Sequence, residues 1–110
     1  MLKRQFRLPA RQKLKQPQIR TTPYFVCKFS VNGLPYPRFG FVVSKAIDKR
    51  SVVRNRTKRL LRFIVEENFN KITPGYDVLF VLRRSIEEKT AYLESMVFGV
   101  LNDLKTSTND

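Results

Sequence analysis

The sequence predicts an α+β fold, a two-layer sandwich in which helices pack against one sheet. Residues 24–31 and 38–44 alternate apolar and polar side chains and are rich in aromatic and β-branched residues, which is typical of half-buried strands. Residues 76–83 hold an apolar run too short for a helix, and this pattern indicates a strand in the centre of the sheet. Residues 51–69 and 85–105 repeat apolar residues at helical spacing.

Residues 1–22 are expected to form a basic arm that precedes a single domain, residues 23–105. The arm has seven basic residues and no acidic one, and Pro9 and Pro17 interrupt it, so it should contain a short helix at most. The sequence leaves three arrangements open for this arm: it is ordered and lies over the domain, it contacts RNA, or it is a solvated terminus. Residues 106–110 are expected to be a frayed tail.

Turn and cap residues separate the predicted elements. Asn32-Gly33 is the strongest short hairpin signal in the chain. Asp48 or Ser51 can cap the first helix, since either side chain can accept a hydrogen bond from a free amide of the first turn. Thr73-Pro74-Gly75 predicts a turn before the central strand, and residues 85–88 form a capping-box pattern before the last helix.

Apolar periodicity indicates which residues face the core. Cys27 alternates with Phe25 and Phe29, so this single cysteine is expected to be a small core residue. The last helix should present one apolar face, formed by Leu93, Met96, Val97, Val100, Leu101 and Leu104.

The charge of the chain indicates a polyanionic partner. Twenty-two Lys and Arg residues face nine Asp and Glu residues, a net charge of +13 at pH 7. Self-repulsion at that charge destabilises a compact domain unless an anion binds; nucleic acid is the first candidate and an anionic membrane surface the second. One cysteine excludes an intrachain disulfide, and no apolar run reaches the roughly 20 residues that span a bilayer. The basic N-terminus lacks the apolar run of a signal peptide, so we expect a soluble, cytoplasmic protein with no membrane partner.

The positive charge is concentrated between Lys45 and Arg62, where eight basic residues accompany one acid, Asp48. On a helical wheel, five side chains fall within an arc of about 140°. This basic stripe consists of Arg54, Asn55, Lys58, Arg59 and Arg62, with Arg56 beside it. Another face, expected to dock onto the sheet, consists of Val53, Leu60, Leu61 and Ile64.

The spacing within the stripe favours nucleic-acid binding over a merely solvated face. A solvated face usually mixes positive and negative side chains. Here Arg54, Lys58 and Arg62 follow one another at intervals of four residues, and like charges at this spacing repel unless an anion is bound. Arg grips phosphate bidentately, and Asn55 can hydrogen-bond a phosphate, a 2′-hydroxyl or a base edge. On charge alone a structural RNA binder such as a ribosomal protein fits equally well. A DNA-binding module fits less well, because most of the stripe suits phosphate rather than base contacts.

The chain lacks the residues expected of a nuclease that performs its own chemistry. It has no histidine, the usual general base near neutral pH. Its acidic residues form no recognisable cluster for two magnesium ions, and Cys27 has no obvious base. We therefore predict no catalytic residue and no small-molecule substrate.

Two motifs together resemble the protein component of bacterial ribonuclease P. Residues 38–45 match an R-x-G-x-x-V-S-K strand, and residues 52–59, followed by Arg62, match an R-N-R-x-K-R helix at the expected separation. The turn at 74–77, the apolar strand and the last amphipathic helix also fit. The resemblance covers about residues 24–105.

The resemblance implies a mixed sheet with a left-handed crossover through the R-N-R helix, the opposite of the usual hand. It also implies binding of the catalytic RNA subunit of ribonuclease P and of precursor tRNA, and help in removing the tRNA 5′ leader. The Mg²⁺ of the holoenzyme would be held mainly by RNA, with none bound tightly by the protein. By similarity, the RNA-binding residues would be Ser44, Lys45, Arg54, Asn55, Arg56, Lys58, Arg59 and Arg62.

The chain departs from the family pattern in three places. The family usually has an N-terminal helix with an aromatic residue beside a cleft on the sheet that receives the leader. Here residues 11–22 contain no aromatic residue and carry Pro17. Ala46 stands where a second basic residue is common, and Phe63 where the family often has Glu. The motifs therefore support binding of the RNA subunit more directly than binding of the leader.

Overall fold

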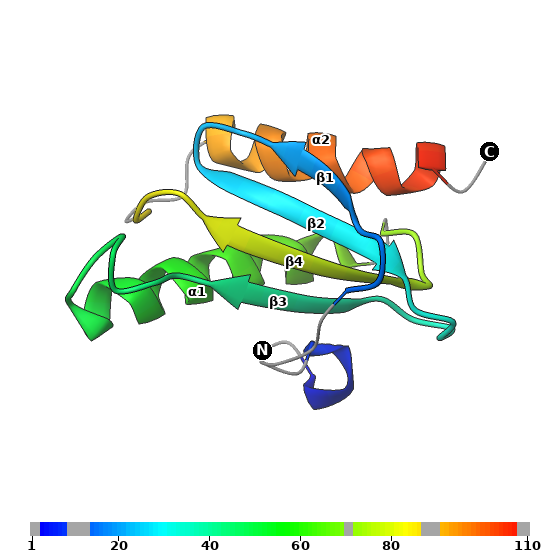
Figure 1. Cartoon of the computed structure of the whole chain (residues 1–110), viewed down its shortest axis with the longest axis horizontal. Helices are drawn as coiled ribbons and strands as arrows, with labels where there is room; N and C mark the ends of the chain where they lie inside the picture. The colour runs from blue at the N-terminus through cyan, green and yellow to red at the C-terminus, as the bar shows by residue number, and fades with distance from the viewer. Residues whose placement is uncertain (1–2, 9–13, 70–71, 87–90, 108–110) are drawn as a thin grey trace.

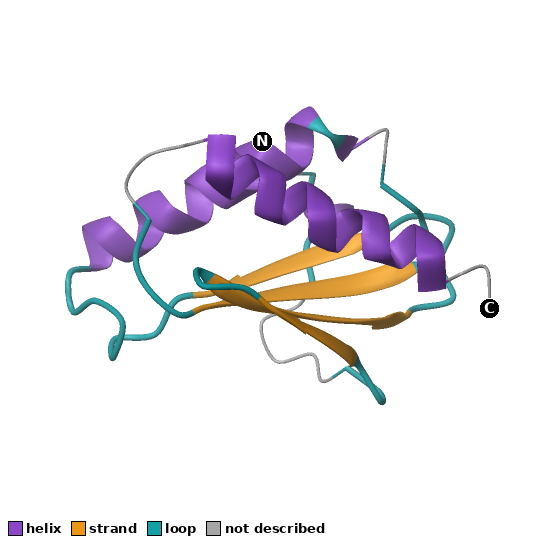
Figure 2. Ribbon diagram, turned by 90° about the horizontal axis from the view of Figure 1, so that it is seen from above, coloured by secondary structure: helices purple, strands orange, loops and turns teal. Residues whose placement is uncertain are grey.

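The computed structural model describes the chain except for residues 1–2, 9–13, 70–71, 87–90 and 108–110, and beyond Asn102 it describes backbone only (Figure 1). The elements in chain order are η1 (Arg4–Phe6), β1 (Gln18–Thr21), β2 (Phe25–Val31), β3 (Arg38–Val42), α1 (Ser51–Glu67), β4 (Tyr76–Leu82) and α2 (Ala91–Ser107). Both α-helices lie on one face of a four-stranded sheet, which confirms the α+β sandwich (Figure 2).

The strands are ordered β1-β2-β4-β3, so β4 is central, as predicted. It pairs antiparallel with β2 and parallel with β3, which makes the sheet mixed. The hairpin predicted from Asn32-Gly33 is wrong, because β4 is inserted between the two strands that this turn joins. Gly33 still has a φ of +71°, and the Asn32 side chain accepts a hydrogen bond from the Leu34 amide at 2.8 Å. The turn forms, but it leads to a strand that pairs elsewhere.

The β3–α1–β4 crossover is left-handed. In Figure 1 the arrows of β3 and β4 both point left and β4 lies above β3, and Figure 2 shows that α1 lies behind the sheet of that view. Turned so that α1 faces the viewer and the strands point upward, β4 lies to the left of β3. This is the rarer hand for a parallel crossover, and it agrees with the family resemblance.

The N-terminal arm contributes to the sheet, which the sequence did not predict. Gln18–Thr21 form β1, which pairs antiparallel with β2, where a short helix at most was expected. Arg7 forms a parallel bridge with Phe39 at the other edge, and the Leu8 amide donates to the Phe39 carbonyl at 2.7 Å. Leu8 is buried over Gly40, where an added Cβ would lie 3.3 Å from the Leu8 Cβ.

The core lies between the sheet and the two helices. Phe25, Cys27 and Phe29 of β2 are fully buried there, which confirms the expected core position of the cysteine. Phe25 packs edge-to-face against Phe80 of β4, with ring centres 5.1 Å apart. Burial of these large side chains supplies most of the driving force for folding.

Helix α2 covers the β1–β2 side of the sheet (Figure 1). Of its predicted apolar face, Leu93, Val97, Val100 and Leu101 are buried, Met96 is partly buried, and the Leu104 side chain lies outside the described residues. The helix runs to Ser107 and so includes the first two residues of the predicted tail. The predicted capping box extends into residues 87–88, which are also not described. Within the described chain, no helix combines the length and apolarity needed to cross a bilayer.

Candidate nucleic-acid interface

Helix α1 packs its apolar side against the sheet and turns its basic side outward. Its buried residues are Val53, Thr57, Leu61, Ile64 and Val65. Three residues of the predicted docking face are therefore buried, and the fourth, Leu60, is partly buried. Thr57 is the unexpected member, since a hydroxyl needs a hydrogen-bond partner when it is removed from water.

The predicted RNA-binding residues of α1 occupy two kinds of position. A half-buried row, spaced one helical turn apart, consists of Arg54, Lys58 and Arg62. The remaining three are exposed: Asn55, Arg56 and Arg59. No ion pair found in the described part of the chain involves Arg56, Lys58 or Arg59. Their positive charge is therefore directed at solvent.

A cavity of about 380 Å³, which we call the edge groove, lies between α1 and β3. Lys58 and Arg62 line it from the helix, and Phe41 and Val42 line it from β3. The Arg62 guanidinium carbon lies 5.8 Å from the centre of the half-buried Phe41 ring. Arg7, placed by its bridge to β3, also lines the cavity. A cavity lined by three cations and the Phe41 ring suits a phosphate together with the flat face of a base.

Arg62 lies in the groove beside another cation, and its pKa is lowered there. Partial burial lowers the pKa of its guanidinium, the nearby positive charge of Arg7 lowers it further, and Glu66 acts in the opposite direction. A protonated guanidinium in such a position gains from an anion placed beside it, because the anion offsets both the desolvation and the repulsion from Arg7.

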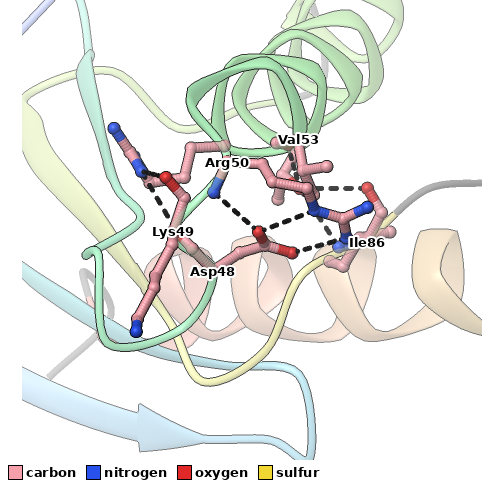
Figure 3. A network of polar contacts seen from close by, with 7 residues as sticks. Asp48, Lys49, Arg50, Val53 and Ile86 are labelled. Atoms are coloured by element: carbon pink, nitrogen blue, oxygen red, sulfur yellow. Dashed lines mark hydrogen bonds and ion pairs between the residues drawn. The ribbon is translucent and has the colours of Figure 1, made fainter.

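The loop before α1 is folded back under the helix start (Figure 3). Asp48 accepts from the Arg50 amide at 2.9 Å and pairs with the Arg50 guanidinium, which lowers the pKa of Asp48. The Arg54 guanidinium donates to the carbonyls of Asp48 and Lys49 at 3.0 and 2.9 Å. Arg54 thus holds this loop with one of its nitrogens, a role that the sequence did not indicate.

The predicted cap of α1 is wrong. The helix begins at Ser51, and its N-cap residue Arg50 has no side-chain cap. Asp48 binds the amide of Arg50 itself, one residue before the first turn. Ser44 and Lys45 are exposed at the start of the same loop, and their side chains make no hydrogen bond or ion pair with the described residues.

Thr57 connects α1 to the segment that follows β4. Its hydroxyl lies 3.0 Å from the carbonyls of Val53 and Ile86, and it accepts from the Ile86 amide at 3.1 Å. Figure 3 shows Val53 and Ile86 joined in this network. Thr57, the x position of the R-N-R-x-K-R motif, therefore holds Ile86, two residues after Arg84, against α1.

Comparison with known proteins decides the family. The family model described as Ribonuclease P matches residues 2–104 of this chain. The chain belongs to the ribonuclease P protein family. Family membership does not favour the alternative of a ribosomal protein.

Relatives and solved structures agree with this assignment. The ribonuclease P protein component of Fusobacterium nucleatum is 42% identical over 65 residues, 59% of this chain and 58% of that protein. That of Alkaliphilus metalliredigens is 37% identical over 75 residues, 67% of each chain. The structure of the RNase P protein from Thermotoga maritima superposes with a TM-score of 0.74 at 27% identity, covering 86% of this chain and 94% of that one. The aligned part thus spans under two thirds of the F. nucleatum protein.

The strand half of the ribonuclease P signature has a structural role here. Arg38 donates two hydrogen bonds to Asp77, at 2.8 and 2.7 Å, and these raise the pKa of the guanidinium against the effect of burial. The Asn32 amide donates to the same carboxylate at 3.0 Å. Gly40 leaves room for Leu8, as described above. The R-x-G triplet therefore orders the sheet edge that the R-N-R helix flanks.

The described residues of this family member do not fit a magnesium site. Three or more His, Cys, Asp or Glu side chains come together nowhere among them. Asp77 is committed to Arg38, and Asp48 to Arg50. We derive no metal-dependent step from this chain.

Proposed function

We propose that this chain is the protein subunit of a ribonuclease P holoenzyme. It binds the catalytic RNA subunit and precursor tRNA and assists removal of the tRNA 5′ leader. The observation that carries this proposal is the edge groove on a ribonuclease P family fold. There Lys58, Arg62 and an aromatic ring line one open cavity, beside the exposed Asn55, Arg56 and Arg59.

Each predicted residue has a role in this proposal. Lys58 and Arg62 bind a phosphate in the edge groove, while Arg56 and Arg59 bind phosphates along the outer side of α1. Asn55 hydrogen-bonds a 2′-hydroxyl or a base edge. Arg54 contacts RNA with the donors that do not hold the preceding loop. The exposed Ser44 and Lys45 extend the surface past the end of β3.

The leader of precursor tRNA would lie on the sheet face that carries no helix. Strand alternation places Lys28, Leu79 and Val81 on that face, all of them partly exposed. Such a surface, apolar with a cation, suits single-stranded RNA. Leu8 crosses the β3 end of this face and marks its border.

Magnesium in the holoenzyme would be held by the RNA. The chain would act by neutralising phosphates, which lowers the cost of bringing two polyanions together. A holoenzyme of this kind works on nascent transfer RNA, so we place the protein in the cytoplasm.

Cleavage of precursor tRNA by the cognate RNA subunit at low magnesium, with and without the protein, tests this function. The protein should bind that RNA and lower the magnesium concentration needed for cleavage. The matched variant Lys58→Ala/Arg62→Ala should fold normally and lose most of this effect. A wild-type protein that neither binds the RNA nor changes the magnesium requirement would contradict the proposal and leave a structural RNA-binding role instead.

A further inference from the structure

A second cation–aromatic cluster lies away from the edge groove, where β2 begins, β4 ends and α2 begins. The Arg84 guanidinium carbon lies 3.9 Å from the centre of the Tyr24 ring, close enough to stack on it. Tyr92, in the first turn of α2, meets Tyr24 edge-on, with ring centres 6.0 Å apart at 62°. Tyr92 is 59% exposed. We call Tyr24, Arg84 and Tyr92 the tyrosine platform.

Backbone contacts fix the geometry of the platform. The Arg83 amide donates to the Tyr24 carbonyl at 2.8 Å, and the Arg83 guanidinium donates to the Thr22 carbonyl at 3.1 Å. Two residues beyond Arg84, Ile86 is held by the buried Thr57 of α1. The segment that carries Arg84 is therefore tied both to β2 and to the basic helix, so Arg84 and Tyr24 are held in place before any ligand arrives.

The platform and the start of α1 lie at the same end of the molecule. Figure 1 shows the arrowhead of β4, the first turn of α1 and the first turn of α2 together at its left side. Arg83 and Arg84 are exposed there, as are Lys49 and Arg50 before α1. Exposed basic residues therefore stand at this end of the molecule both before α1 and beside the platform.

We propose that the tyrosine platform is a stacking site for an unpaired base of RNA. This rests on the proposed RNA-binding function and extends it to a surface outside the R-N-R helix. An exposed tyrosine on a helix is ordinary by itself. Here, however, the ring stands on a second ring that already carries a guanidinium, in a chain of net charge +13. Aromatic rings with adjacent arginine are the usual means of holding single-stranded RNA without sequence preference, whereas a duplex offers no free base face.

The sequence offers a direct reporter of stacking, because the chain has no tryptophan. In the Tyr92→Trp variant, the emission of the introduced indole reports on position 92 alone. Titration with a single-stranded RNA of about twelve nucleotides should quench that emission at least twofold, whereas a blunt RNA duplex of the same length should leave it nearly unchanged. The matched control is Val31→Trp at the opposite end of β2, where the native side chain is 75% exposed and the emission should not respond.

Binding measurements separate a ligand contact from a structural role. Tyr92→Ala should weaken binding of the same single-stranded RNA by roughly fivefold or more, the loss expected for one stacked base, while Tyr92→Phe should bind like the wild type. The unfolding midpoint in urea should stay the same in both variants, since the side chain is mostly exposed.

Two results would contradict the proposal that the tyrosine platform stacks an RNA base. In one, the Tyr92→Trp protein binds single-stranded RNA with wild-type affinity and its emission does not change; the base then stacks elsewhere, and the proposed function stands. In the other, the wild-type protein binds no single-stranded RNA, and the precursor-tRNA assay then shows separately whether the RNA subunit is still bound.

Discussion

The basic residues at the two ends of strand β3 have different roles. At its start, Arg38 is half-buried and holds the carboxylate of Asp77, which is only 4% exposed. Toward its end, Arg62 of α1 lies over the Phe41 ring, and Lys58 lines the same open groove. The first site is a completed pair, and the second is a set of cations that an anion can still approach.

The difference teaches that the partner, rather than the residue type, decides what an arginine does in this protein. A charge paired inside the fold is already compensated, and removing its partner leaves a buried charge unsatisfied. A cation at a groove contributes little to folding and gains its interaction only when phosphate binds. Substitutions at the two ends of β3 should therefore change different measured quantities.

The largest effect is expected at the paired end. Asp77→Asn keeps the shape of the side chain but removes the charge that Arg38 faces, so the free energy of unfolding in urea should fall by about 2–4 kcal/mol. Asp48→Asn, in an ion pair near the surface, is the control and should change stability far less. At temperatures where Asp77→Asn is folded, it should bind RNA like the wild type. Equal destabilisation by the two variants would show that the buried Arg38–Asp77 pair contributes no more to stability than the surface pair.

A smaller loss is expected at the connection between the two regions. Thr57→Val keeps the volume but leaves the Ile86 amide and carbonyl without their buried partner, which should cost about 1–3 kcal/mol in the unfolding free energy. Thr57→Ser retains the hydroxyl and should be closer to the wild type. If valine and serine were equally stable in this position, the hydrogen bonds to Ile86 would not hold the segment.

The smallest effect separates hydrogen bonding from charge on α1. Asn55→Ala should weaken RNA binding about twofold to tenfold, the value of one hydrogen bond, without changing the salt dependence of binding. Arg59→Ala, on the same exposed side, should weaken binding and also make the salt dependence shallower. A steeper or shallower salt dependence for Asn55→Ala would mean that the substitution displaces a phosphate contact.

Much of the fold followed from local patterns. The alternation in β2 and β3, the apolar run of β4 and the helical spacing of α1 and α2 are strong signals, because burial repeats with the period of each element. Strand β1 gave no such signal. Its one apolar residue, Ile19, is 52% exposed, and the strand is held mainly by backbone pairing to β2, which no local pattern reveals.

The candidate site could be predicted only in part for a similar reason. The wheel of α1 separated the basic stripe from the docking face, because both depend on helical geometry alone. The edge groove depends on Arg7 and Phe41, which lie far from the stripe in sequence and reach it through the pairing of β3. The roles of Arg54 in the loop and of Thr57 at Ile86 likewise depend on chain reversals rather than on spacing.

The salt dependence of RNA binding tests the central claim most directly. The logarithm of the affinity of the wild type for the RNA subunit should fall linearly with the logarithm of salt concentration, by about 0.7–0.9 per phosphate contact. Lys58→Ala, in the edge groove, should make this slope shallower by roughly one unit. Lys28→Ala removes the same charge from the sheet face proposed for the leader, and it should leave this slope unchanged because the titration contains the RNA subunit and no precursor tRNA. Equal slopes for the two variants, or no change in either, would contradict the assignment of the edge groove as the site where this protein binds its RNA.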